Sequence, residues 1–141
     1  MLFSRECDYG LRILRNLKMN EVTSVSNIVG HEYMSVAMGY KVARKLELAG
    51  LIRSQRGHTG GYLLTRGLDE ITLYDAYTAI DPNIFITDCL RTDFDCPMKE
   101  ERGEMCRVHC ELKRIQSVLV RELKAKSLLQ IVTEDPAVEV S

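Results

Sequence analysis

The sequence contains no tryptophan, and only 6% of its 141 residues are aromatic. A chain of this length is enough for one compact domain with a long appended helix, but not for two large domains. Because so few large side chains are available to fill a core, we expect further apolar surface to be buried between subunits.

Long apolar segments are also absent. No run reaches the roughly 18–20 residues that span a bilayer, and no apolar stretch of the kind found in secretory signals follows residues 1–6. We therefore expect a cytoplasmic protein with no membrane partner. In a reducing compartment the five cysteines are expected to bind metal or to act in redox chemistry, rather than to form a disulfide framework.

The net charge of −1 hides an uneven distribution of charge along the chain. Residues 1–68 hold 10 Lys/Arg and 5 Asp/Glu, whereas residues 69–141 hold 9 Lys/Arg and 15 Asp/Glu. A basic half joined to an acidic half suits a protein whose first part approaches phosphate groups, although uneven surface charge alone would give the same numbers.

The first half has the pattern of a helix-turn-helix. Apolar spacing predicts an amphipathic helix over 4–20, a short helix that Gly30 ends, and a longer helix over 36–49. Ser35 stands where the N-cap of the longer helix belongs, and Gly50 where its C′ glycine belongs. Two short helices joined by a tight turn, the second with a basic outer face, are typical of this DNA-binding motif.

A glycine-rich hairpin follows the longer helix. The strands predicted at 51–54 and 62–65 flank a tip that contains three glycines, and Arg53 and Arg56 make the hairpin basic. This pattern predicts a wing. A phosphate-cradling loop of a nucleotide enzyme is disfavoured, because no Walker lysine follows and no helix opens after Gly61.

The second half combines helices with a cysteine-rich segment. A helix is predicted over 71–80, followed by a polar segment and then a helical stripe of apolar residues over 112–123. The stripe indicates a dimerisation helix, although packing on its own domain is the alternative. The predicted organisation is a DNA-binding domain over 1–80, a sensor loop over 81–110, and a dimerisation helix with a short C-terminal helix over 111–141.

The sensor loop holds four thiols with the spacing Cys89-x6-Cys96-x9-Cys106-x3-Cys110. Thiolates are soft ligands that suit iron–sulfur clusters or zinc, so cluster binding is favoured, with zinc or no metal as the alternatives. An enzyme that uses Cys106 as nucleophile and His109 as base is disfavoured, because no convergent catalytic set accompanies the pair. Cys7 is interpreted as a packing residue.

Taken in order, these motifs resemble the Rrf2 family of winged-helix regulators. The resemblance covers nearly the whole chain, and its most specific element is the Arg-Gly-x-x-Gly-Gly-Tyr wing. It is carried by these stretches: Cys7-Asp8-Tyr9-Gly10-Leu11-Arg12, Leu46-Glu47-Leu48-Ala49-Gly50-Leu51-Ile52, Arg56-Gly57-His58-Thr59-Gly60-Gly61-Tyr62-Leu63-Leu64, Glu70-Ile71-Thr72-Leu73 and Ser127-Leu128-Leu129.

The resemblance implies a mostly α fold with a small β-hairpin wing, and a homodimer that binds a double-stranded DNA operator and regulates transcription. Recognition helices place their first residues over base edges, while flanking cations contact phosphates. The expected base-reading residues are Ser35, Ala37, Met38 and Lys41. The expected backbone or minor-groove contacts are Arg44, Arg53, Arg56, His58 and Thr59.

The family also implies an iron–sulfur cluster, 2Fe-2S or 4Fe-4S, that modulates operator binding. Cys89, Cys96 and Cys106 match the three cysteines that hold it in the family. Cys110, His109 and Asp8, the last from the other subunit, remain candidates for the fourth ligand. A thiol-redox or zinc sensor of the same fold is the alternative, and a module that binds another protein is a further one.

Overall fold

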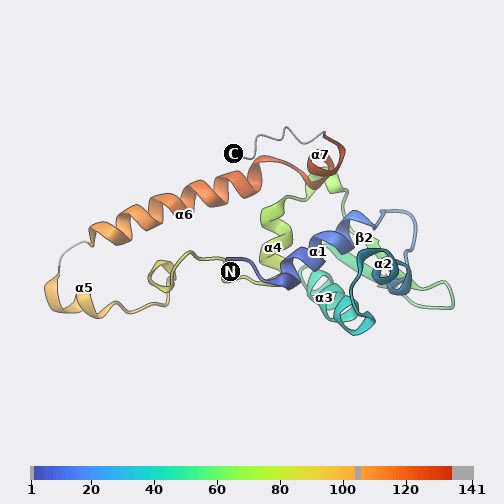
Figure 1. Cartoon of the computed structure of the whole chain (residues 1–141), viewed down its shortest axis with the longest axis horizontal. Coiled ribbons are helices and arrows are strands. Elements are labelled where there is room, and N and C mark those ends of the chain that lie inside the picture. Colours follow the sequence, from blue (N-terminus) through green and yellow to red (C-terminus); the bar gives the residue numbers. More distant parts are fainter. Residues whose placement is uncertain (1, 104–105, 135–141) are drawn as a thin grey trace.

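The computed structural model describes residues 2–103 and 106–134 and shows a winged helix with a long helical arm (Figure 1). Within the described residues it is mostly helical, with one antiparallel hairpin, as predicted. The body contains, in order, α1 (Arg5–Arg15), α2 (Val25–Glu32), α3 (Val36–Leu48), β1 (Ile52–Gln55), β2 (Gly61–Leu64), the 3-10 turn η1 (Leu68–Glu70) and α4 (Leu73–Ile80).

The hydrophobic core lies where α1, α3 and α4 pack against one another. Leu14, Val42 and Leu46 are completely buried there, as the helical spacing of apolar residues predicts. Gly10 lets α1 approach α4 closely, because a Cβ at this position would lie 3.1 Å from the Ile80 side chain.

The hairpin is anchored to the body through its second strand. Residue Ile52 pairs with Leu64 in the antiparallel register. Thr23, just before α2, forms an isolated bridge with Tyr62 through two backbone hydrogen bonds of 2.9 and 3.1 Å. The wing is therefore held on the same body that carries the helix-turn-helix.

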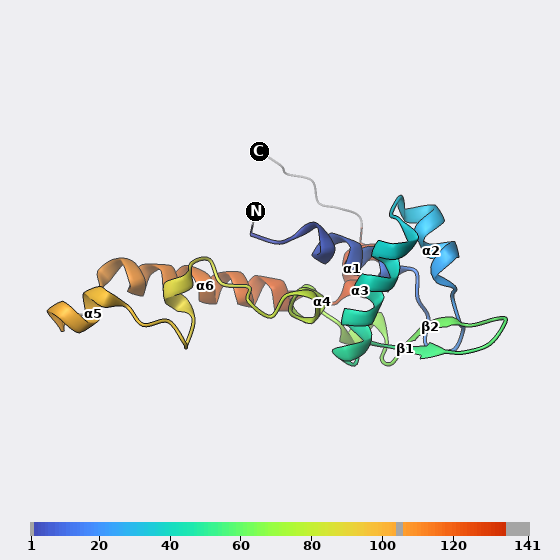
Figure 2. The ribbon, with the colours of Figure 1, turned by 90° about the horizontal axis from the view of Figure 1, so that it is seen from below.

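The arm carries the cysteine-rich segment, and Figures 1 and 2 show it extending away from the body. It comprises η2 (Asp88–Leu90), α5 (Pro97–Arg102) and α6 (Arg107–Ala125), after which α7 (Leu128–Thr133) returns to the body. Gln116 joins α6 to the irregular segment that leads out from α4, since its side chain donates to the Ile84 carbonyl at 2.8 Å and accepts from the Ile86 amide. No helix of the described residues is long and apolar enough to cross a membrane.

The boundaries of several elements differ from those predicted. The first helix ends at Arg15 rather than at residue 20. The next residue, Asn16, donates from its side-chain amide to the Arg12 carbonyl. Gly30 does not end α2, which continues until Tyr33 adopts a left-handed conformation with φ 53°. Glycine lowers helix propensity but leaves the i→i−4 hydrogen bonds available, and neighbouring contacts decide where the helix stops.

The predicted sensor loop is also more ordered than its polar sequence suggested. It contains the 3-10 turn η2 and the short helix α5, which has Pro97 in its first turn, where proline is tolerated. The long helix begins at Arg107, within the segment that the sequence assigned to the loop. The last part of the predicted C-terminal segment 111–141, from residue 135 on, lies outside the described residues.

Candidate nucleic-acid interface

The candidate recognition helix is α3, and its N-terminus is capped as the sequence predicts. The Ser35 hydroxyl accepts a hydrogen bond from the Met38 amide at 3.2 Å. Ala37 and Lys41 are exposed, whereas Met38 is only partly exposed and packs against the core. Three of the four predicted base-reading residues, Ser35, Ala37 and Lys41, are therefore exposed, and Met38 is less so.

Every cation on α3 lies beside a carboxylate. The two oxygens of Glu6, on α1, contact the ammonium groups of Lys41 at 2.5 Å and Lys45 at 2.6 Å. Hydrogen bonds from these two lysines lower the pKa of Glu6 below its ordinary value. Arg44 lies 3.7 Å from Glu47, one turn further along the helix. The positive charge of the helix is thus largely balanced within the protein.

The exposed face of α3 also carries large apolar groups that the sequence analysis did not select. Such side chains can contact thymine methyl groups or stack on sugars, although they provide no bidentate hydrogen bonds to bases. The sequence does contain a signal for their exposure, because these residues fall outside the stripe of apolar positions that is buried in the core. They are Tyr33 just before the helix, 91% exposed, together with Val36, Tyr40 and Leu48.

The wing presents its cations differently. Arg53, Arg56, His58 and Thr59 are all exposed. Among the described side chains, none forms an ion pair with either arginine. Residues 51–68 contain no Asp or Glu. Arg66, just after the second strand, lies 3.9 Å from Asp75, so the uncompensated positive charge of the wing is that of Arg53 and Arg56.

Local hydrogen bonds fix α3 and the wing side by side (Figure 2). Glu47 accepts from the Ser54 hydroxyl at 2.8 Å and from the Ser54 amide at 3.3 Å, which links α3 to β1. Tyr62 on β2 is also near Glu47. Burial raises the pKa of the Tyr62 hydroxyl, and the negative charge of Glu47 raises it further. The last turn of α3 and the two strands of the hairpin are consequently held together.

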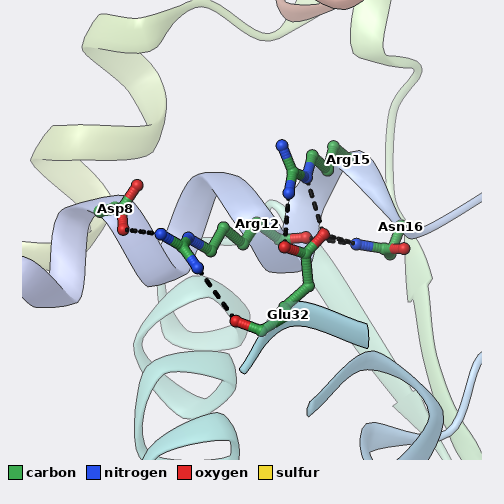
Figure 3. A network of polar contacts seen from close by, with 5 residues as sticks. All are labelled: Asp8, Arg12, Arg15, Asn16 and Glu32. Carbon is green, nitrogen blue, oxygen red and sulfur yellow. Dashed lines mark hydrogen bonds and ion pairs between the residues drawn. The ribbon is translucent and has the colours of Figure 1, made fainter. Parts of the chain in front are cut away.

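A buried carboxylate holds the turn between α2 and α3 (Figure 3). Glu32, the last residue of α2, is 6% exposed and accepts from Arg15 at 2.7 and 2.5 Å and from Asn16 at 2.6 Å. Arg12 donates to the Glu32 carbonyl and also pairs with Asp8. Arg15 is the main cause of the lowered pKa of Glu32. We refer to Arg12, Arg15, Asn16 and Glu32 as the turn clamp.

The structure does not bring the four thiols of the arm together. Cys89 and Cys96 are half-buried, and Cys106 and Cys110 are exposed. Over residues 2–103 and 106–134, no three His, Cys, Asp or Glu side chains converge as a metal site would require. The chemistry of the donors nevertheless fits a cluster or zinc, since all four thiols are free and lie outside the core.

The remaining predicted ligands have other local contacts. Asp8 forms an ion pair with Arg12 one turn along α1, at 2.9 Å. Cys106 is the N-cap of α6, and its sulfur accepts from the His109 backbone amide at 3.4 Å rather than from the imidazole. Cys7 is 1% exposed in the core, which agrees with its interpretation as a packing residue.

A capped helix beside a basic hairpin on a helical body defines a winged helix-turn-helix DNA-binding regulator. Residues 3–134 match the Rrf2 family, described as iron-dependent transcriptional regulators, and the chain belongs to this family. It is 30% identical over 128 residues to the HTH-type transcriptional regulator YffB of Lactococcus lactis, covering 89% of this chain and 81% of the relative. It is also 25% identical over 112 residues to IscR of Photorhabdus laumondii, covering 78% and 65% of the two chains.

Solved structures support the same fold. The structure of CymR, the global cysteine regulator of Bacillus subtilis, superposes with a TM-score of 0.70 at 24% identity, covering 94% of this chain and 98% of that one.

The relatives are transcriptional regulators and not enzymes, which excludes the reading of Cys106 and His109 as a catalytic pair.

Proposed function

We propose that this regulator binds a specific double-stranded DNA operator with α3 in the major groove and the wing on the adjacent backbone. The observation that supports this most directly is the exposed, uncompensated wing beside the exposed face of α3, with Glu47 and Ser54 joining the two. The side chains that then contact the sugar–phosphate backbone or minor groove are Arg44, Arg53, Arg56, His58 and Thr59. Those that lie toward the bases are Ser35, Ala37, Met38 and Lys41.

Fluorescence anisotropy with DNA from upstream of the protein's own gene tests this proposal. We expect binding on the order of 10³-fold tighter than to a shuffled duplex of the same composition. Arg53→Ala should weaken binding to both duplexes, because it removes a backbone contact. Arg121→Ala on α6 is the matched control, since Arg121 is also exposed but lies on the arm. Equal affinity for both duplexes would contradict the proposal for this operator.

We propose that the protein is a homodimer that pairs through α6. Only Leu123 of this helix is buried, and Val108 and Ile115 are 66% and 39% exposed. An apolar stripe on a helix that stands away from its own body is expected to be covered by another helix. Dimerisation also suits a partly palindromic operator, because a two-fold protein reads two half-sites.

Sedimentation equilibrium measures the oligomeric state directly. We expect a dimer for the wild-type chain and a monomer for Ile115→Glu, because a buried unpaired charge disfavours the interface. Lys113→Glu changes an exposed charge two residues away and should remain dimeric. A monomeric wild-type protein at micromolar concentration would contradict this part of the proposal.

We infer that the arm holds an iron–sulfur cluster through Cys89, Cys96 and Cys106, with Cys110, His109 or the partner's Asp8 as fourth ligand. A bound cluster supplies redox chemistry and sensitivity to oxidants. The thiols themselves provide four soft donors within 22 residues, and the last two lie at the start of α6, since Cys106 is its N-cap and Cys110 is in its first turns. IscR relatives, and the family description as iron-dependent, support a cluster.

A thiol-redox or zinc sensor is the second candidate. The CymR structures that share this fold include an oxidized form from Staphylococcus aureus, and Cys106 and Cys110 are both exposed and free here. Anaerobic purification with iron, sulfide and zinc analysis separates the two candidates. Iron and visible absorption that disappear in Cys96→Ser but persist in Cys7→Ser support the cluster. Colourless protein that contains zinc, or that contains no metal and forms a disulfide on oxidation, supports the alternative.

A further inference from the structure

The carboxylate of Glu6 occupies an unusual place for a DNA-binding surface. It lies on the first turn of α1, yet it bridges the ammonium groups of two lysines one turn apart on α3. Glu6 is 20% exposed, whereas Lys41 and Lys45 are 58% and 37% exposed, so the carboxylate lies at the edge of the surface that α3 presents. Any duplex that approaches Lys41 also approaches Glu6.

We propose that Glu6 is a specificity-determining residue that occupies Lys41 and Lys45 and so suppresses sequence-independent binding of α3 to DNA. This inference rests on the proposed role of α3 as recognition helix. Lysine ammonium groups contribute to binding of any duplex, because each phosphate contact releases counterions regardless of sequence. A lysine held by an internal carboxylate contributes less of this non-specific affinity, and the carboxylate itself repels phosphate.

The ion pairs are suited to this role because they are exchangeable. Pairs between partly exposed side chains contribute little to stability, so phosphate groups can compete with Glu6 for the two lysines. The wing has no such carboxylate, and its arginines stay available for the backbone. Base-specific contacts by α3 then make up a larger share of its total binding energy, which raises the ratio of specific to non-specific affinity.

Binding of a random-sequence duplex by Glu6→Gln tests the inference. Glutamine keeps the size of the side chain and removes its charge. We expect about three- to tenfold tighter binding at low salt, with the plot of log K against log salt steeper by about one, as for one further phosphate contact. Glu134→Gln is the control, because Glu134 also pairs with a lysine, Lys126, but lies at the end of α7.

The same substitution in a variant without the two lysines separates two effects of Glu6→Gln. One is the release of Lys41 and Lys45 from their ion pairs, and the other is the loss of a negative charge near the DNA. In the Lys41→Ala/Lys45→Ala protein, Glu6→Gln should no longer steepen the salt dependence, since no lysine remains to be released. Unchanged or weaker binding by Glu6→Gln, with wild-type protein that binds the duplex normally, would overturn the inference and leave the proposed function intact. Wild-type protein that binds no duplex at any salt concentration would overturn both.

Discussion

The proposed recognition helix α3 carries three cations and the wing carries two arginines, and the surroundings of these charges differ. On α3, Lys41 and Lys45 contact Glu6, and Arg44 lies near Glu47. The wing has its arginines exposed, in a stretch from 51 to 68 without acidic residues. The difference suits the proposed binding mode if the wing supplies electrostatic affinity and α3 supplies discrimination between sequences.

The two regions are also attached to the body by different forces. The start of α3 depends on the turn clamp, where Glu32 is held by the guanidinium of Arg15 and the amide of Asn16. The wing depends on backbone pairing between Thr23 and Tyr62, next to a glycine. The first attachment depends on charged side chains. The second depends on backbone hydrogen bonds, which require a close approach that only glycine allows at position 61. The two attachments should therefore respond differently to mutation and to pH.

The largest effect is expected where the wing meets the body. Gly61→Ala would place a Cβ 2.1 Å from the Thr23 carbonyl oxygen, and backbone atoms cannot move aside cheaply. We expect a loss of about 3 kcal/mol in the free energy of unfolding, of the size that overpacking causes. Urea unfolding followed by circular dichroism measures it.

Gly30→Ala is the matched control for this change. Gly30 lies within α2, and a Cβ there would have no neighbour within 4 Å. Alanine is the better helix former, so stability should rise by about 0.5–1 kcal/mol. Destabilisation by Gly30→Ala equal to that of Gly61→Ala would refute the steric account of the wing attachment.

A somewhat smaller effect is expected at the turn clamp. Glu32→Gln keeps the shape but removes the charge that Arg15 faces, and we expect a loss of about 2 kcal/mol in the free energy of unfolding. Glu21→Gln, at an exposed pair with Lys18, should change stability by less than about 0.5 kcal/mol. If the two variants were equally stable, the clamp would not hold the turn.

The clamp should also make stability depend on pH, which the wing attachment should not. Arg15 lowers the pKa of Glu32 below 4.5, so the unfolded chain binds this proton more readily than the folded one. The stabilisation is complete above about pH 4.5 and is lost as pH falls through the folded pKa. The difference between wild type and Glu32→Gln should therefore shrink in acid, while the deficit of Gly61→Ala should stay constant. A difference that grows in acid would contradict this assignment.

The sequence predicted the winged helix well, because its local signals agree with its packing. The N-cap at Ser35, the C′ glycine at Gly50 and the apolar period of α3 all specify the same helix, and the structure confirms them. Boundaries set by tertiary contacts were predicted less well. The prediction that α2 ends at Gly30 was wrong, because the helix continues to Glu32. There Glu32 contacts Arg15 of α1, which lies 17 positions earlier in the sequence.

The site was only partly predictable, for a related reason. Exposure of Arg53 and Arg56 follows from hairpin geometry, which is local. The pairing of Lys41 and Lys45 with Glu6 joins residues 35 and 39 positions apart, and no periodicity in the sequence reports it. The spacing of the cysteines identified candidate ligands. Whether the four thiols come together depends on the fold of the arm and on its contacts with the partner subunit, which the spacing does not specify.

The salt dependence of duplex binding by Arg56→Ala and Lys41→Ala tests most directly whether the wing supplies the electrostatic affinity. Each backbone contact contributes about 0.9 to the slope of log K against log salt. We predict that Arg56→Ala flattens the slope by about this amount, whereas Lys41→Ala, whose ammonium group Glu6 already occupies, leaves it nearly unchanged. A flatter slope for Lys41→Ala with an unchanged slope for Arg56→Ala would contradict the account.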